Sequence, residues 1–310
     1  MTSGGKALDS SRPVRSDDSF DVDRVHSWLR RQIPDLPDSA PEVGQFPGGA
    51  SNLTYSLTYP EQDLILRRPP AGTKARSAHD MVREFEVQQR LRPSFPLAPK
   101  VLALCTDSEV LGDDFYVMER IPGTILRRDP PADLSLTTEA ARTLSEATAD
   151  TLIKLHQVDV DGAGLTSLGR GPGYVHRQIS GWSDRYRAAQ TENVPDFHTV
   201  MSWLSANEPA DVGACLIHGD FRLDNLVLDP DTFEIIGVLD WELATVGDPL
   251  MDLGNSMAYW VQADDDPGMQ LARRQPTHLP GMLTRDEFVQ RYCDAMQLPT
   301  DNWLFYEAYG

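Results

Sequence analysis

The feature that most constrains this chain is a set of polar residues placed on both sides of a short strand–turn–strand pattern. The octapeptide HGDFRLDN, which starts at His218, is followed by two β-rich runs and then by Asp240. A hairpin returns the chain to the end at which it began, so this order predicts that Asp220, Asn225 and Asp240 lie close together. The two runs and the turn between them are Leu226–Leu228, Ile235–Leu239 and Asp229-Pro230-Asp231.

These three residues suit phosphoryl transfer, a reaction that needs positioning and charge stabilisation more than covalent help from the protein. Asp220 can accept or orient the proton of an attacking hydroxyl, and Asn225 and Asp240 offer the hard oxygen ligands that Mg²⁺ prefers. His218 is expected to support the loop rather than to react. The competing interpretation is that Asp, Asn and Gly only form turns at strand ends here. The order and spacing of the whole segment favour the chemical interpretation.

On HGDFRLDN and the Asp240-Trp-Glu sequence after the hairpin, the chain resembles the aminoglycoside phosphotransferase and choline kinase family, which is related to protein kinases. The resemblance extends from Gly48–Asn52 to Gly247–Gly254 and is closest to the bacterial phosphotransferase branch that is similar to the kinase-like domain of acyl-CoA dehydrogenase fusions. It implies an α+β, protein-kinase-like two-lobe fold, with a small antiparallel-sheet N-terminal lobe and a mainly helical C-terminal lobe. It also implies a small-molecule kinase that uses ATP or GTP with Mg²⁺ and phosphorylates a hydroxyl acceptor.

The resemblance assigns phosphate contacts in the first lobe. Ser51 and Asn52 belong to a loop that would cover the phosphates, although this loop alone is also typical of an ordinary hairpin turn. Arg67 falls where most kinases have a phosphate-binding lysine, and choline kinases are similar in using arginine there. Strand alternation sends the neighbouring Arg68 to the opposite face.

Two further nucleotide contacts follow from the resemblance. Glu84, on the next helix, is the implied ion-pair partner of the strand arginine, and Glu86 stays open as an alternative. The end of the first lobe is similar to the hinge that binds an adenine edge, through backbone atoms of Glu119 and Ile121.

Several other polar residues are expected to support the site rather than to react. Asp248 precedes a proline and is expected to cap a helix. Asp252 is a candidate for buried support of the catalytic loop, and Glu242 is a candidate contact for metal or substrate. His156 is expected to pack or cap at a helix end. Arg222, inside the loop, is a candidate phosphate contact.

Periodicity and chain-breaking residues suggest three parts. Residues 1–20 are predicted to be a mobile tail, 21–122 an N-terminal nucleotide-binding lobe, and 123–310 a C-terminal helical catalytic and acceptor lobe. The predicted strands of the first lobe are Val43–Phe46, Leu53–Tyr59, Leu64–Arg67, Lys100–Thr106 and Phe115–Arg120. The predicted helices are Asp21–Ile33, Ser77–Leu91, Thr137–His156, Ser180–Gln190, Val200–Asn207, Met251–Val261, Arg285–Met296 and a core segment, Asn302–Gly310.

Composition limits the kinds of partner and the cellular compartment that we expect for this chain. The formal net charge of −19 argues against a nucleic-acid partner, because phosphate backbones are bound through Lys and Arg. The 3 cysteines are widely spaced, which favours a reducing cytoplasm over a disulfide framework or a zinc site. No signal-peptide stretch is visible, and no run reaches the roughly 18 apolar residues of a membrane span, so we expect a cytoplasmic protein without a membrane partner.

Two other functions stay open on the sequence. A non-catalytic kinase-like module that binds a ligand or scaffolds a partner is favoured by Arg67 in place of lysine and opposed by the intact Asp220, Asn225 and Asp240. A protein kinase is disfavoured because the loop reads HGD rather than HRD and no DFG or APE segment follows. The sequence also leaves open the acceptor (aminoglycoside-like, choline-like or hydroxyacyl), the choice of ATP or GTP, and the oligomeric state.

Overall fold

The computed structural model describes residues 9–47, 52–70, 80–130, 134 and 136–310. These residues divide into two compact units. Unit 1 runs to Thr124 and also includes Val227–Thr232 and Ile236–Glu242, whereas unit 2 comprises Ile125–Leu226, Phe233–Ile235 and Leu243–Gly310. Each unit is described below by itself.

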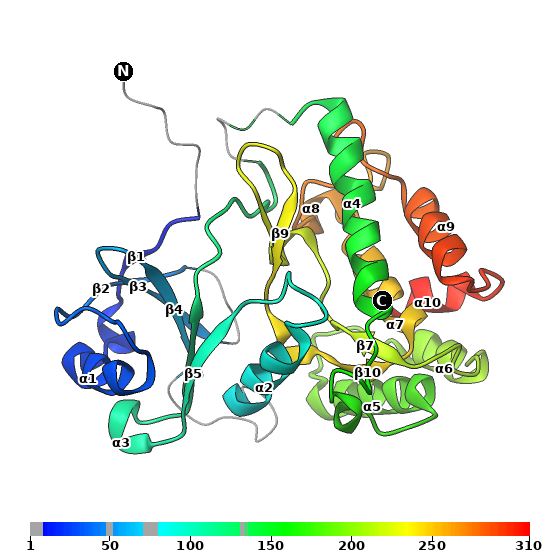
Figure 1. Ribbon diagram of the computed structural model, residues 1–310. Helices are drawn as coiled ribbons and strands as arrows, with labels where there is room; N and C mark the ends of the chain where they lie inside the picture. Colours follow the sequence, from blue (N-terminus) through cyan, green and yellow to red (C-terminus); the bar gives the residue numbers. More distant parts are fainter. Residues whose placement is uncertain (1–8, 48–51, 71–79, 131–133, 135) are drawn as a thin grey trace. The chain divides into compact units, whose positions relative to one another are not determined.

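Unit 1 is built on an antiparallel sheet to which six strands contribute within the described residues, in the order β1-β2-β3-β4-β6-β5 (Figure 1). β4 lies at the centre of this sheet, and Leu66 in it pairs with Tyr55 on one side and Val117 on the other. The strands are β1 Arg12–Pro13, β2 Glu42–Gln45, β3 Leu53–Thr58, β4 Asp63–Arg68, β5 Val101–Cys105 and β6 Phe115–Glu119. The predicted β-rich first lobe is therefore present, with β1 as an additional edge strand.

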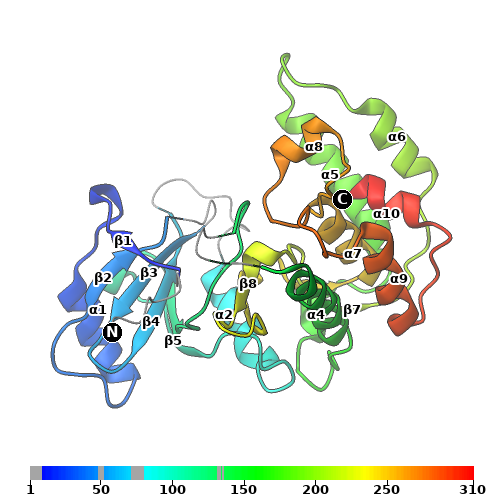
Figure 2. The same ribbon diagram turned by 90° about the horizontal axis from the view of Figure 1, so that it is seen from above.

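Two helices cover the opposite faces of this sheet, because successive side chains of a strand point to opposite sides. α1 (Val22–Gln32) buries Trp28 and Leu29 against the face that carries Leu64 and Leu66. α2 (Met81–Leu91) packs on the face that carries Ile65. Figure 2 shows the sheet between the two helices. The face under α2 is also the face to which Arg67 points.

The hairpin of β8 (Leu226–Leu228) and β9 (Ile235–Val238) is largely part of unit 1. Leu228 exchanges backbone hydrogen bonds with Thr124, and the N–H of Val238 donates to Leu97 O at 2.8 Å. The prediction that assigned all of 123–310 to the helical lobe was therefore wrong for this hairpin. It erred because long-range pairing, which leaves no local sequence signal, decides where a hairpin packs.

Unit 2 is mainly helical. Its helices are α4 Thr138–His156, α5 Tyr174–Ala189, α6 His198–Ala206, α7 Pro249–Ala258, α8 Pro267–Ala272, α9 Arg285–Met296 and α10 Trp303–Tyr309. α10 packs on α7, α9 packs on α4, and the short strands β7 (Cys215–Ile217) and β10 (Thr245–Gly247) form an antiparallel pair. The predicted helical lobe is present, and α7 begins where Asp248 accepts hydrogen bonds from the N–H groups of Leu250 and Met251, so the expected cap is confirmed.

Residues 9–20 differ from the predicted mobile tail. They contain β1 and a 3₁₀ turn at Ser16–Asp18, and Asp18 O accepts hydrogen bonds from Tyr55 Oη at 2.7 Å and Arg68 Nη2 at 2.6 Å. The prediction was wrong here because contacts with residues far along the chain attach the segment to the sheet: Val14 and Phe20 pack against its core, in addition to the backbone contacts of Asp18. None of the helices in the described residues combines the length and the apolarity that crossing a bilayer requires.

Candidate active site

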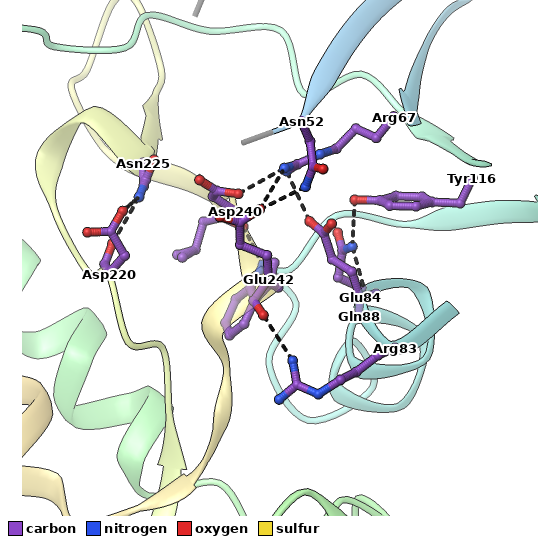
Figure 3. Close-up of polar contacts among 12 residues, drawn as sticks. Asn52, Arg67, Arg83, Glu84, Gln88, Tyr116, Asp220, Asn225, Asp240 and Glu242 are labelled. Carbon is purple, nitrogen blue, oxygen red and sulfur yellow. Dashed lines mark hydrogen bonds and ion pairs between the residues drawn. The ribbon is translucent and has the colours of Figure 1, made fainter. Parts of the chain in front are cut away.

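Arg67 is the centre of a buried ion cluster in unit 1. Its Nη1 lies 3.0 Å from Glu84 Oε1 on α2, and its Nη2 lies 2.9 Å from Asp240 Oδ1, just beyond β9 (Figure 3). Glu242 Oε2 lies 4.0 Å from the same Nη2. We call these four residues, with Asn52, the Arg67 cluster.

The structure decides between the alternatives that the sequence left open around Arg67. Glu84 is the glutamate that contacts it, whereas Glu86 pairs with Arg90 on the helix surface. Arg68 lies on the opposite face of the strand, where it donates to Tyr55 Oη, as strand alternation predicts.

The Arg67 cluster holds more negative than positive charge, since three carboxylates surround one guanidinium. Burial raises the pKa of Glu84 to about 7, and Asp240 and Glu242 act in the same direction against the opposing effect of Arg67. Burial also opposes the charge of Arg67, but Glu84, Tyr116 and Asp240 outweigh it and raise the pKa of Arg67 well above its usual value. The cluster is thus suited to receive an additional cation.

Asp240 has an unusual backbone. Its φ is 68°, in the left-handed region that few residues other than glycine adopt and that Asp and Asn tolerate best. Such strain is concentrated at functional sites. The neighbouring Glu242 is fixed from two elements of unit 1, because Asn52 Nδ2 donates to its Oε2 at 2.7 Å and Arg83 Nη1 donates to its carbonyl oxygen at 2.9 Å.

In unit 2, the loop His218–Asn225 follows β7 and is held from beneath by one buried carboxylate. Asp252 Oδ2 accepts the N–H of His218 at 2.9 Å, and Oδ1 accepts the N–H of Gly219 at 2.8 Å. His156 Nε2 lies 3.0 Å from Oδ2. Although burial alone would raise it, the pKa of Asp252 lies below its ordinary value because His156 and the backbone N–H groups stabilise the carboxylate. The expected buried support of the loop by Asp252 is confirmed.

Asp220 presents its two carboxylate oxygens differently. Its Oδ2 lies 3.0 Å from Arg222 Nη2. The same oxygen lies 3.2 Å from Asn225 Nδ2 (Figure 3). Asn225 Nδ2 also donates to the carbonyl oxygen of Asp220 at 2.9 Å. The amide nitrogen of Asn225 is therefore committed to Asp220, which leaves its amide oxygen as the atom able to ligate a metal.

The predicted site residues fall in both units. Asn52, Arg67, Glu84 and Asp240 come together in the Arg67 cluster, whereas Asp220 and Asn225 come together in unit 2. Ser51 lies outside the described residues. Glu119 ends β6, and Ile121 lies two residues further along the chain; the N–H of Glu119 donates to Lys100 O at 2.9 Å. The sequence left Glu242 as a secondary candidate, and nothing in it indicated that Asn52 contacts Glu242.

A pocket of about 490 Å³ opens in unit 2 beside Gly219. Aromatic and aliphatic side chains from α5, α6 and the segment after the hairpin provide most of its wall, including Trp182, Phe197 and Leu243, which are among the most exposed large apolar residues of the chain. Asp252 is the one carboxylate among the described residues that line it. An apolar pocket that touches a polar loop is the usual form of a small-molecule site.

Together these features define a protein-kinase-like α+β protein with a loop of the HGDxxxxN type. Among solved structures, the chain is similar to a Ralstonia eutropha protein provisionally named an aminoglycoside phosphotransferase, with a TM-score of 0.75, 29% identity and coverage of 94% of this chain and 85% of that one. A choline kinase from Cryptosporidium parvum, at a TM-score of 0.58, 15% identity and coverage of 93% and 85%, shares the fold. The predicted fold class is confirmed.

The chain belongs to the phosphotransferase enzyme family, whose profile matches residues 42–302. It is 35% identical over 302 residues to acyl-CoA dehydrogenase family member 10 of Mus musculus, covering 97% of this chain and 28% of that protein. It is 33% identical over 296 residues to acyl-CoA dehydrogenase family member 11 of Homo sapiens, covering 93% of this chain and 37% of that protein. The chain thus spans well under half the length of these curated relatives. The predicted family is confirmed.

Proposed function

We propose that this chain is a magnesium-dependent kinase that transfers the γ-phosphoryl group of ATP or GTP to a hydroxyl of a small molecule, with Asp220 as the base. The observation that carries the proposal is the way in which Asp220 is held. Two donors fix its Oδ2, so Oδ1 is the oxygen offered to the proton of an acceptor hydroxyl. Membership of the phosphotransferase enzyme family supports the same class of reaction.

In the proposed reaction, Asp220 orients the acceptor hydroxyl and takes its proton as the new O–P bond forms. The bond between the γ-phosphorus and its bridging oxygen breaks, and ADP or GDP leaves with the electron pair. Arg67, held by Glu84, would bind the nucleotide phosphates through its planar fork. The carbonyl of Glu119 and the N–H of Ile121 would bind the adenine edge.

Mg²⁺ would bind Asn225 and Asp240 and neutralise charge on the phosphates. The residues fit this ion, because Asn225 has a free amide oxygen and Asp240 belongs to a cluster with excess negative charge. Mg²⁺ is usually held by one or two carboxylate or amide oxygens together with water and phosphate, so a larger set of protein ligands is not required.

For the acceptor, the pocket favours a hydroxyacyl compound over the other two classes. A polycationic aminoglycoside needs carboxylates, and Asp252, the carboxylate in the described lining, is already engaged by three donors. Aromatic faces can bind a choline-like cation, but the ring of Trp182 already carries the Arg185 guanidinium at 4.1 Å, and about 490 Å³ is far more than choline fills. An apolar acyl chain that carries a hydroxyl matches both the lining and the volume.

One observation favours a second candidate, a non-catalytic module that binds a ligand without turnover. The carboxylate of Asp240, a proposed metal ligand, is already paired with Arg67, whose Nη2 lies 2.9 Å from Asp240 Oδ1. If nucleotide with Mg²⁺ cannot displace this pair, the fold binds without catalysis.

A nucleotide-binding experiment separates the two candidates. Thermal unfolding is followed with ATP or GTP, with and without Mg²⁺, and a kinase gains about 2.7 kcal/mol of stability at a nucleotide concentration of 100 times Kd. Release of ADP or GDP is then measured with kanamycin, choline and 3-hydroxyoctanoyl-CoA as acceptors. Magnesium-dependent stabilisation with acceptor-dependent release supports the kinase, whereas the absence of both turns the assignment to the binding module.

The acceptor class has its own pair of variants. Phe197→Asp places a charge in the pocket wall and is expected to raise KM for 3-hydroxyoctanoyl-CoA about 10- to 100-fold, since burying such a side chain contributes about 1.5–3 kcal/mol. Leu271→Asp is the matched control, because Leu271 is an exposed apolar residue that does not line the pocket. Equal KM values in the two variants would exclude the hydroxyacyl assignment.

A further inference from the structure

Arg222, one of the two donors to Asp220 Oδ2, also makes contacts that the proposed function does not use. Its Nη2 lies 3.0 Å from Asp220 Oδ2, and its Nε lies 3.2 Å from Asp224 Oδ1. Its guanidinium carbon lies 4.5 Å from the centre of the Tyr259 ring. Two carboxylates and an aromatic ring thus surround the guanidinium, an arrangement in which lysine, with one ammonium group, cannot make all three contacts.

Tyr259, whose ring faces the guanidinium of Arg222, is linked to the loop His218–Asn225 through hydrogen bonds of Gln275. Gln275 is fully buried, and its Nε2 donates to the carbonyl oxygen of Tyr259 at 2.9 Å. Its Oε1 accepts the N–H of Leu223, the residue after Arg222, at 2.7 Å. One buried amide therefore links the backbone of the loop to the residue whose ring supports the guanidinium. Such a fully bonded buried link rigidifies the groups it joins.

The charge of Arg222 is already matched inside the loop, because one guanidinium faces the carboxylates of Asp220 and Asp224. Withdrawing the guanidinium toward a phosphate would leave two carboxylates close together in a partly buried place. This cost argues against a direct contact between Arg222 and nucleotide, the role that the sequence left open for it.

We propose that Arg222 is a positioning residue for Asp220. Its guanidinium fixes Oδ2, so that Oδ1 faces the acceptor hydroxyl, and Tyr259 and Gln275 keep the guanidinium in that place. This inference rests on the proposed function, in which Asp220 is the base. It predicts a defect in the chemical step and none in nucleotide affinity.

The test uses the full chain with MgATP and two acceptors, 3-hydroxyoctanoyl-CoA and water. Arg222→Gln is expected to lower kcat about 10- to 100-fold, the effect of misplacing a catalytic group, while KM for ATP and Kd for ADP stay within about twofold. Arg222→Lys should recover part of kcat, because it restores the charge but not the fork. Arg187→Gln, which removes an exposed arginine paired with Asp184 on α5, should leave kcat unchanged.

The ring of Tyr259 gives a second, independent pair of variants. Tyr259→Leu removes the aromatic face and is expected to lower kcat about 5-fold or more, whereas Tyr259→Phe keeps the face and should match the wild type. This pair decides the question if Arg222→Gln fails to fold.

The possible outcomes separate this inference from the proposed function. An active Asp220→Asn would refute the assignment of the base, and with it both proposals. An inactive Asp220→Asn with unchanged kcat in Arg222→Gln or Tyr259→Leu would refute only the positioning role. A raised KM for ATP with unchanged kcat in Arg222→Gln would make Arg222 a phosphate ligand instead.

Discussion

Replacing Asp252 by Asn removes one buried charge and leaves the shape of the side chain almost unchanged. In the wild type, Oδ1 accepts the N–H of Gly219, and Oδ2 accepts the N–H of His218 and faces His156. An amide offers one oxygen and one NH₂ group. Whichever way it faces, at least one buried N–H of the loop then meets another donor.

The size of the effect follows from these contacts. A hydrogen bond to a charged group contributes about 1.5–3 kcal/mol, and a buried donor left without a partner costs about 1–3 kcal/mol. Asp252→Asn should therefore lower the free energy of unfolding by about 3–5 kcal/mol and Tm by roughly 10 °C. It should also lower kcat, because the loop that carries Asp220 loses its anchor. Urea unfolding and scanning calorimetry measure the first effect, and steady-state kinetics the second.

The loss of stability in Asp252→Asn should depend on pH in a defined direction. The pKa of Asp252 is lowered in the fold, so its contribution to stability is complete above the unfolded value of about 3.9 and is lost as pH falls through the folded pKa. The difference between the wild type and Asp252→Asn should therefore be constant above about pH 5 and shrink below about pH 4.

Asp248→Asn is the matched control, because Asp248 is a buried carboxylate of the same helix. Asn can keep the cap through its amide oxygen, but its NH₂ group then faces the N–H of Val212, which Asp248 Oδ2 accepts at 2.7 Å in the wild type, so Asp248→Asn should also lose stability. The two variants should differ in pH dependence. Burial raises the pKa of Asp248, so its carboxylate should contribute less stability as pH rises from the unfolded to the folded pKa. Equal losses in the two variants, with the same pH dependence, would refute the role assigned to Asp252.

Two other predictions concern Glu84 and Gly219. Since the pKa of Glu84 is raised from 4.5 to about 7 in the fold, the wild type should lose stability relative to Glu84→Gln as pH rises through that interval, and parallel urea-unfolding curves at pH 5 and pH 8 would contradict this. Gly219→Ala should cost about 1–3 kcal/mol and lower kcat, because φ is 82° and the new Cβ would lie 2.8 Å from Leu243 Cβ. The control Gly171→Ala, at φ 73° with nothing within 4 Å of the Cβ, should lose only about 1 kcal/mol, and an equal loss in both would remove the steric argument.

The sequence predicted the elements with strong periodicity and the residues that carry a motif. The helix at Thr137–His156 and the strands around Arg67 have regular apolar patterns, and the structure forms them within a residue or two of the predicted ends. The fold class and the family followed from HGDFRLDN and the hairpin after it. The roles of Asp220, Asn225 and Asp240 stay predictions.

Long-range contacts account for most of what the sequence did not reveal. α5 begins at Tyr174 rather than at the predicted Ser180, because Asp211, far along the chain, accepts the N–H groups of Gly173, Tyr174 and Val175. A cap supplied from a distance leaves no mark beside the helix that it starts. Gln275 was missed for the same reason, since a single buried amide in an irregular segment has neither a period nor a motif.

The most direct test of the central claim is the transfer of ³²P from [γ-³²P]ATP to 3-hydroxyoctanoyl-CoA by the wild type and by Asp220→Ala under single-turnover conditions. The account predicts that Asp220→Ala binds ATP with Mg²⁺ as tightly as the wild type but forms no labelled acceptor. Labelled acceptor at the wild-type rate from Asp220→Ala would contradict it.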